Sequence, residues 1–313
     1  MKDTHQLPIL IIGHRRREEI LVVLEALKEI QPQRLYLAMD GPRSDDELYL
    51  TEAARKSAQA AVEWNCELKT LFSDVNLGSR DFMLKAIDWF YSEVEIGIIL
   101  EDDIVISSDF IDFVNVVISS PRWINGEIGI IASICYQHIM PNGFKKKAFI
   151  SRIPAIWGWA TRRSIWQSFR EAQEPDATLK LWFKLFRKIT IWQSMLFTLC
   201  LRLVRQGKLQ AWDYDFATYL LLHNKLTIYP ATSLATNIGF SELATHTANK
   251  KPKGLGIKTK SFENWELSRA DFKINKFYQQ RQSLNTPFEK EYYSHVTKGL
   301  VALFLNTIGL GKK

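Results

Sequence analysis

Three consecutive carboxylates, Glu101, Asp102 and Asp103, directly follow the apolar run at residues 97–100. Adjacent negative charges at the end of a buried strand repel one another and are costly to remove from water. A divalent cation such as Mg²⁺ or Mn²⁺ would offset both penalties, because these ions prefer oxygen ligands. The alternative is a solvated acidic turn in which Asp109 caps the helix that follows. Other polar residues at predicted strand ends favour the metal-binding interpretation.

A second pair of carboxylates, Asp213 and Asp215, precedes the helical pattern of residues 216–223. A carboxylate beside an attacking hydroxyl can accept its proton, an effect of roughly 10²–10⁴-fold on rate. Side chains at positions i and i+2 diverge on a helix, so only one of the two is expected to face a shared site. Asp213 is the first candidate for such a base and Asp215 the second. The alternative role for Asp213 is to cap the helix.

These residues need a scaffold, and the first hundred residues alternate between strand and helix patterns. Apolar runs predict strands at 7–12, 34–39, 67–72 and 95–100, and amphipathic segments predict helices at 16–30, 46–64 and 79–94. This order predicts a parallel sheet with helices on both faces. Ligands of such sheets bind beyond the carboxyl ends of the strands. We therefore expect Asp40, Asn76 and the three carboxylates to surround one crevice.

The second half of the chain is less regular. Its patterns predict strands at 129–135 and 225–230, a helix from about residue 162, a mobile loop at 248–262 and a helical tail at 292–313. Residues 179–204 mix aromatic, aliphatic and basic side chains. That composition is compatible with an interfacial helix on anionic lipid and with an ordinary helical pair that covers the core.

Composition favours anionic partners. The 313 residues carry 41 Lys and Arg against 34 Asp and Glu, a net charge of +7, which suits nucleoside diphosphates or acidic lipid. The basic residues are scattered without a recognition motif, which argues against nucleic acid. The three cysteines are widely spaced, as expected in a reducing cytoplasm. We expect neither a signal peptide nor a transmembrane helix, because the apolar runs are too short.

Several motifs occur together in an informative order. They are Gly13-His14-Arg15-Arg16 after the first strand, Ala38-Met39-Asp40-Gly41, Leu100-Glu101-Asp102-Asp103, Ile156-Trp157-Gly158-Trp159-Ala160, Trp212-Asp213-Tyr214-Asp215, Asn237-Ile238-Gly239 and Thr245-His246-Thr247. In this order, residues 7–250 resemble nucleotide-sugar glycosyltransferases of the GT-A fold. The chain is most similar to bacterial enzymes of the family-two type and more distantly similar to N-acetylglucosaminyltransferase I.

The resemblance implies transfer of a sugar from a nucleoside diphosphate to an acceptor hydroxyl, assisted by Mn²⁺ or Mg²⁺. It implies that Asp103 contacts the metal, that Asp102 binds ribose or metal-bound water, and that Glu101 supports them. The chain reads Glu-Asp-Asp where Asp-X-Asp is commoner, which puts the role of Glu101 in doubt. His246 is implied as a further metal ligand, with a structural histidine as the alternative. Asp213 is implied as the base of an inverting reaction.

The resemblance also implies a binding surface for the donor. Asp40 would bind the nucleotide base, with capping of the turn at 41–42 as its alternative role. Arg16 would approach the nucleotide, and the residues expected to line its side are Asn76, Gly78 and Arg80. The aromatic loop of Trp157, Gly158 and Trp159 would pack against the donor sugar and the acceptor, or else form a buried aromatic turn.

The sequence therefore predicts a GT-A-type α/β fold, Rossmann-like, with a mostly parallel sheet flanked by helices and a helical C-terminal extension. We expect a transferase domain at 1–250, divided into a nucleotide-binding half at 1–130 and an acceptor half at 131–250. Residues 251–313 would form the mobile loop and the extension.

The predicted activity is metal-dependent transfer from a nucleotide-sugar donor, a UDP-sugar first, to a saccharide or lipid-linked acceptor in cell-surface polysaccharide or glycolipid synthesis. One alternative is a carboxylate-metal phosphohydrolase or nucleotidyltransferase. Another is a non-enzymatic, basic, membrane-associated binding protein. The expected location is the cytoplasm, with peripheral attachment to the inner face of the plasma membrane.

Overall fold

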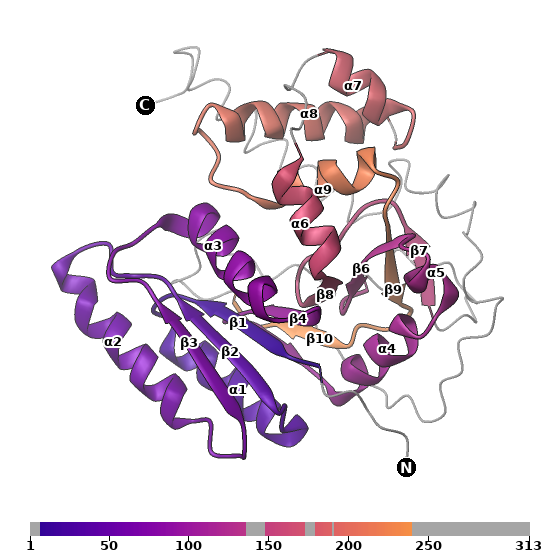
Figure 1. The fold of residues 1–313 in the computed structure, drawn as a ribbon. Helices are drawn as coiled ribbons and strands as arrows, with labels where there is room; N and C mark the ends of the chain where they lie inside the picture. The colour runs from indigo at the N-terminus through magenta and orange to yellow at the C-terminus, as the bar shows by residue number, and fades with distance from the viewer. Residues whose placement is uncertain (1–6, 136–147, 173–178, 190, 240–313) are drawn as a thin grey trace.

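The computed structural model describes residues 7–135, 148–172, 179–189 and 191–239. Its strands are β1 (Ile9–Gly13), β2 (Arg34–Met39), β3 (Glu67–Phe72), β4 (Ile96–Glu101), β5 (Ile104–Ile106), β6 (Ile128–Ala132), β7 (Ala148–Ser151), β8 (Trp159–Arg162), β9 (Leu226–Pro230) and β10 (Ala235–Asn237). Eight of them form one sheet in the order β3-β2-β1-β4-β8-β6-β9-β7, and β5 pairs with β10 in a second sheet (Figure 1).

Helices cover both faces of the large sheet (Figure 1). They are α1 (Arg17–Ile30), α2 (Asp45–Ala60), α3 (Gly78–Glu93), α4 (Ser108–Ile118), α5 (Pro121–Ile124), α6 (Arg163–Glu171), α7 (Leu179–Phe186), α8 (Ile191–Arg205) and α9 (Asp213–Leu222). The strands β1, β2, β3 and β4 pair in parallel, as predicted. The α/β class is confirmed.

The second half of the sheet is mixed. β8 runs antiparallel between β4 and β6, β9 is parallel to β6, and β7 is antiparallel to β9. The strands predicted at 129–135 and 225–230 exist within a few residues of their expected bounds. The predictions for 248–262 and 292–313 and for the C-terminal extension fall outside the described residues.

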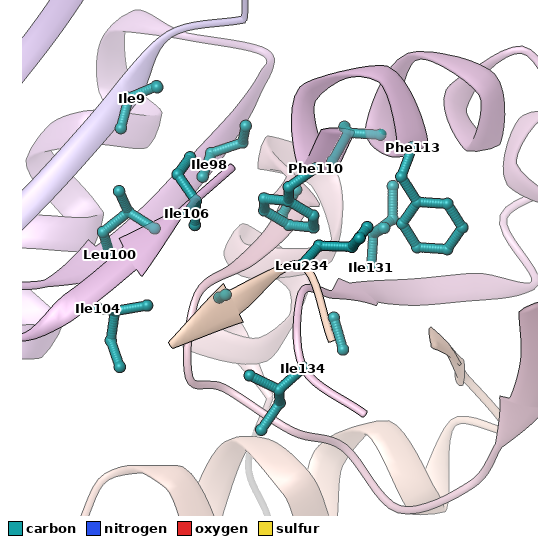
Figure 2. Packing of buried hydrophobic residues seen from close by; sticks show 14 of the residues in the cluster. Ile9, Ile98, Leu100, Ile104, Ile106, Phe110, Phe113, Ile131, Ile134 and Leu234 are labelled. Carbon is teal, nitrogen blue, oxygen red and sulfur yellow. The ribbon is translucent and has the colours of Figure 1, made fainter. Parts of the chain in front are cut away.

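Strand alternation divides the core into two layers. Ile9 and Ile11 of β1 belong to a cluster with α1, α2, α4 and α5, whereas Leu10 and Ile12 belong to a cluster with α3, α6 and α9. Successive side chains of a strand point to opposite faces, so a continuous apolar run buries both. Figure 2 shows part of the first layer, in which aromatic side chains of α4 point toward residues of β6 and the segment before β10. Both layers fix β1 and β4, whose carboxyl ends carry the candidate site.

Helices α7 and α8 form a separate layer beyond α9 (Figure 1). Their buried residues Leu181, Leu185, Phe197 and Leu201 pack on Ala217 and Leu221 of α9. This arrangement matches the helical pair that was one of two interpretations for residues 179–204. Within the described residues, none of the helices is both long enough and apolar enough to cross a bilayer.

Candidate functional site

Glu101 ends β4, and Asp102 and Asp103 form the tight turn between β4 and β5. β4 is parallel to β1, with Glu101 opposite Ile12, and the backbone N–H of Asp102 donates to the carbonyl of Ile12 at 2.9 Å. Gly13 follows, and a Cβ added there would lie 2.9 Å from Cβ of Asp102. The end of β1 therefore brings its backbone directly against the acidic turn, which requires the smallest residue at that position.

The other side of the turn is held by β10. β10 pairs antiparallel with β5, and the N–H of Ile238 donates to the carbonyl of Asp103 at 2.9 Å. Gly239 comes so close that a Cβ added there would lie 1.9 Å from Oδ2 of Asp103. This contact joins residues far apart in sequence. Neither β5 nor β10 was among the strands predicted from the sequence, although the motif of residues 237–239 marked the end of β10.

Arg16 supplies positive charge to the acidic turn. Its guanidinium forms an ion pair with Asp102 and donates to Oδ2 of Asp103 at 2.7 Å. Burial lowers the pKa of Arg16, but the charges of Asp102 and Asp103 outweigh that effect and raise it overall. The sequence predicted Arg16 near the nucleotide and a divalent cation as the answer to the carboxylate repulsion. The structure shows that an internal cation already offsets part of this repulsion.

Glu101 and Asp102 still retain protons more strongly than exposed carboxylates do. Burial raises the pKa of Asp102 to about 6, although Arg16 opposes the shift. Burial also raises the pKa of Glu101 well above its usual range, and the charges of Asp103, Asp102 and Asp213 add to the shift. A group whose charge is incompletely compensated in this way favours binding of another cation.

Asp103 is the residue that best fits a metal ligand. Among the described residues, no hydrogen-bond donor reaches its buried Oδ1, and the residue as a whole is 6% exposed. A buried carboxylate oxygen without a donor is rare and is suited to a hard cation. Within the described ranges, however, no cluster of three His, Cys, Asp or Glu side chains converges on one point. His246 lies outside those ranges, so the set of Glu101, Asp103 and His246 stays a prediction.

The carboxylate of Asp40 is engaged within the chain, and its bond to Gly41 matches the turn-capping alternative to base binding. It is buried after β2, and its Oδ1 accepts from the N–H groups of Gly41 at 2.8 Å and Leu77 at 2.9 Å. Its Oδ2 accepts from Asn76 Nδ2 and from the N–H of Gly78, both at 3.0 Å. Four donors saturate a carboxylate. Asp40 and Asn76 therefore hold the start of α3 together, and the predicted base contact would require breaking one of these bonds.

We expect Asp40→Ala to lower the free energy of unfolding by about 2–4 kcal/mol, because it leaves four donors without their charged acceptor. Urea denaturation measures this loss. Asp74→Ala is the matched control, since Asp74 is exposed in the same loop region, and it should change stability by less than about 0.5 kcal/mol. Unchanged stability in Asp40→Ala would restore the base-binding role.

The two carboxylates at the start of α9 diverge, as predicted. Asp215 pairs with Arg80, whose Nη2 lies 3.3 Å from Oδ2 of Asp215. Asp213 lies close enough to both Glu101 and Asp215 for their charges to interact. Burial raises the pKa of Asp213 to about 6. Arg80 and Asp215 thus tie α3 to α9, which leaves Asp213 as the carboxylate suited to proton transfer.

The aromatic motif contributes mainly to the core. Trp159 is the first residue of β8, is 1% exposed and stacks on Trp212 with ring centroids 6.0 Å apart. The predicted contact of Trp159 with sugar is therefore corrected to core packing. Gly158 has φ +66°, and an added Cβ would lie 2.7 Å from Oγ of Ser133. Trp157 is partly buried, and its carbonyl accepts from Ser133 at 2.8 Å.

The remaining basic residues near the site have structural partners. Arg15 pairs with Glu47, and Arg17 Nε donates to Ser57 at 2.8 Å, so both connect the start of α1 to α2. No sequence pattern indicated Arg55, a buried residue of α2 whose Nη2 donates to the carbonyl of Asp40 at 3.2 Å. Arg55 therefore stabilises the carboxyl ends of β2 and β3.

Comparisons with known proteins find a likeness among solved structures alone. No family model and no curated protein matches the chain. HddC from Yersinia pseudotuberculosis aligns at 12% identity and a TM-score of 0.32, over 52% of this chain and 79% of its own. A UDP-glucose pyrophosphorylase complexed with UDP-glucose aligns at 10% identity and a TM-score of 0.31, over 53% of this chain and 80% of its own.

The glycosyltransferase GlyE of Streptococcus pneumoniae TIGR4 aligns at 15% identity and a TM-score of 0.29, over 52% of this chain and 35% of its own. The pyrophosphorylase structure contains UDP-glucose, and GlyE is named a glycosyltransferase. Likenesses of this size carry no argument about what this chain does, so its function has to be argued from its own residues.

Proposed function

We propose that the chain is a glycosyltransferase that moves a sugar from a nucleoside-diphosphate donor to an acceptor hydroxyl, with inversion at the sugar. A UDP-sugar is the first expectation for the donor. The observation that carries the proposal is the buried Oδ1 of Asp103, which has no donor among the described residues, in a turn within electrostatic range of Asp213. Binding of the divalent ion that accompanies the donor diphosphate and removal of the acceptor's proton each need a carboxylate.

Asp213 is the proposed base. Its pKa of about 6 means that it is ionised at neutral pH and is a stronger base than an ordinary carboxylate. It would accept the acceptor's hydroxyl proton as the hydroxyl oxygen attacks the sugar carbon and the diphosphate leaves. Direct attack from the opposite face inverts the configuration, which is why a single base is sufficient.

Asp103 and Arg16 would act on the donor side. Mn²⁺ or Mg²⁺ held by Asp103, with Glu101 and His246 as further proposed ligands, would supply positive charge for the departing diphosphate. Arg16 carries a guanidinium that suits phosphate oxygens as well as carboxylates. In the structure it is engaged by Asp102 and Asp103, so a phosphate contact requires it to release one of them.

The test is donor-induced thermal stabilisation. UDP-, GDP- and dTDP-sugars, each with and without Mn²⁺, are compared on the wild-type protein, on Asp103→Asn and on the control Asp74→Asn. We expect one donor class with Mn²⁺ to raise Tm by on the order of 5 °C at about 100 times Kd, and Asp103→Asn to abolish this increase. The readout is the change caused by the ligand, because Asp103→Asn also alters the pairing of Arg16.

Reaction products separate the proposal from its alternatives. Release of UDP from a UDP-sugar in the presence of an acceptor supports glycosyl transfer. Release of pyrophosphate from a nucleoside triphosphate and a sugar phosphate would indicate a nucleotidyltransferase instead. Absence of any donor-induced shift, with or without Mn²⁺, would contradict both enzymatic functions and favour the non-enzymatic binding protein.

A further inference from the structure

The outer faces of α7 and α8 carry a stripe of exposed apolar side chains. On α7, Leu179, Phe183 and Phe186 recur at helical spacing, and Leu179 and Phe183 are 70% and 52% exposed. On α8, the corresponding exposed residues are Ile191, Met195 and Leu199. Positions separated by three or four residues share one side of a helix. Each helix therefore presents a continuous apolar stripe to solvent.

This exposure is not a sign of poorly packed helices. The opposite sides of both helices are buried, with Leu181 and Leu185 of α7 and Leu201 of α8 packed toward α9. Figure 1 shows that α9 separates α7 and α8 from the sheet, so their outer faces lie at one end of the molecule. Both helices are thus apolar on two sides, and a helix that is apolar on two sides needs a second apolar contact.

The same segment is strongly basic, with a net charge of +7. Residues 177–212 include seven Lys and Arg and no Asp or Glu, so the remaining residues carry 34 basic and 34 acidic side chains. The seven are Lys180, Lys184, Arg187, Lys188, Arg202, Arg205 and Lys208. Of these, Lys180, Lys184 and Arg187 on and after α7 and Arg202 on α8 are exposed beside the apolar stripes. The exposed face of α7 and α8 therefore combines apolar side chains with positive charge and carries no negative charge.

We propose that the outer face of α7 and α8 binds the surface of an anionic lipid bilayer. Apolar side chains of an interfacial helix enter the acyl boundary, while neighbouring lysines and arginines stay at the level of the lipid phosphates. Each such cation contributes about fivefold to binding. The absence of acidic residues from 177–212 removes the repulsion that an anionic surface would otherwise cause. The inference does not depend on the proposed transferase activity.

Vesicle flotation of the full-length protein tests the inference. We expect binding to vesicles of phosphatidylcholine with phosphatidylglycerol, weaker binding to phosphatidylcholine alone, and loss of affinity as salt rises. Phe183→Ser with Met195→Ser should reduce affinity at least tenfold, because two side chains lose their burial in lipid. Lys180→Gln with Lys184→Gln should reduce it on the order of tenfold on anionic vesicles, with little effect on neutral ones.

The matched control is Val75→Ser with Ile124→Ser, which removes apolar side chains of similar exposure elsewhere on the molecule. This control should bind as the wild type does, and circular dichroism should show that all variants are folded. Wild-type protein that does not float with anionic vesicles overturns the proposal. Equal binding by the apolar variant and the control also overturns it. A dimer that only the apolar variant loses, without vesicle binding, would assign the face to a second copy of the chain.

Discussion

We expect Asp213→Asn to lower kcat by roughly 10²–10⁴-fold with a much smaller effect on donor binding. The amide cannot accept the acceptor's proton, whereas the turn that carries Asp103 remains intact. Steady-state rates with the donor identified by thermal shift measure the effect. Asp215→Asn is the matched control on the same helical turn: it loses the pair with Arg80 but should keep turnover within about tenfold of the wild type. Equal losses in both variants would contradict the assignment of the base.

The pH dependence of the same group has a defined sign. A base must be ionised, so kcat/KM should fall about tenfold per pH unit below the pKa of about 6. The contribution of Asp213 to the free energy of unfolding has the opposite pH dependence and increases as pH falls. The folded state holds this proton more tightly than the unfolded state, so Asp213 stabilises the fold most below pH 4 and progressively less up to pH 6.

Above pH 6 the carboxylate of Asp213 is ionised, and its desolvation lowers the free energy of unfolding. We therefore expect Asp213→Asn to be more stable than the wild type by about 1–2 kcal/mol at pH 8, with the difference shrinking toward pH 4. Urea denaturation at several pH values measures the difference. A variant that is less active but more stable is the pattern expected of a residue retained for chemistry.

The parallel half of the fold follows from the sequence because its signals are local. β2 and β3 have the predicted bounds of 34–39 and 67–72, since each is an apolar or alternating run between amphipathic segments. The predicted end of α2 at residue 64 was four residues late, because α2 stops at Ala60. The strand β8 was not predicted, because four residues become a strand through pairing with β4 and β6 rather than by their own pattern.

The site was predictable in location more than in detail. A run of carboxylates at a strand end was visible in the sequence, and parallel strands bring such ends together. The pairing of Arg16 with Asp103 joins residues 87 positions apart, which no local pattern encodes. In the same way, Asp40 was correctly placed at a strand end, but three of its four donors come from residues 76–78 at the start of α3, which only the folded chain brings to it.

We expect Arg16→Met to lower the free energy of unfolding by about 3–5 kcal/mol at neutral pH, because it leaves Asp102 and Asp103 buried without their cation. Urea denaturation measures this loss. Arg17→Met is the control one position along, where the side chain is half exposed, and it should cost less than about 1 kcal/mol. Adding Asp102→Asn to Arg16→Met should recover part of the lost stability, since one of the two uncompensated charges disappears.

The same variant distinguishes a metal-binding turn from a purely structural one, without any measurement of activity. With Arg16 removed, Mn²⁺ should stabilise the protein by about 2.7 kcal/mol at 100 times its Kd if the two carboxylates bind it. The double variant Arg16→Met with Asp103→Asn should lose this response, because the ligand with the free Oδ1 is gone. If Mn²⁺ has no effect on Arg16→Met, the acidic turn exists to hold Arg16. The positive charge for a departing diphosphate would then have to come from that arginine.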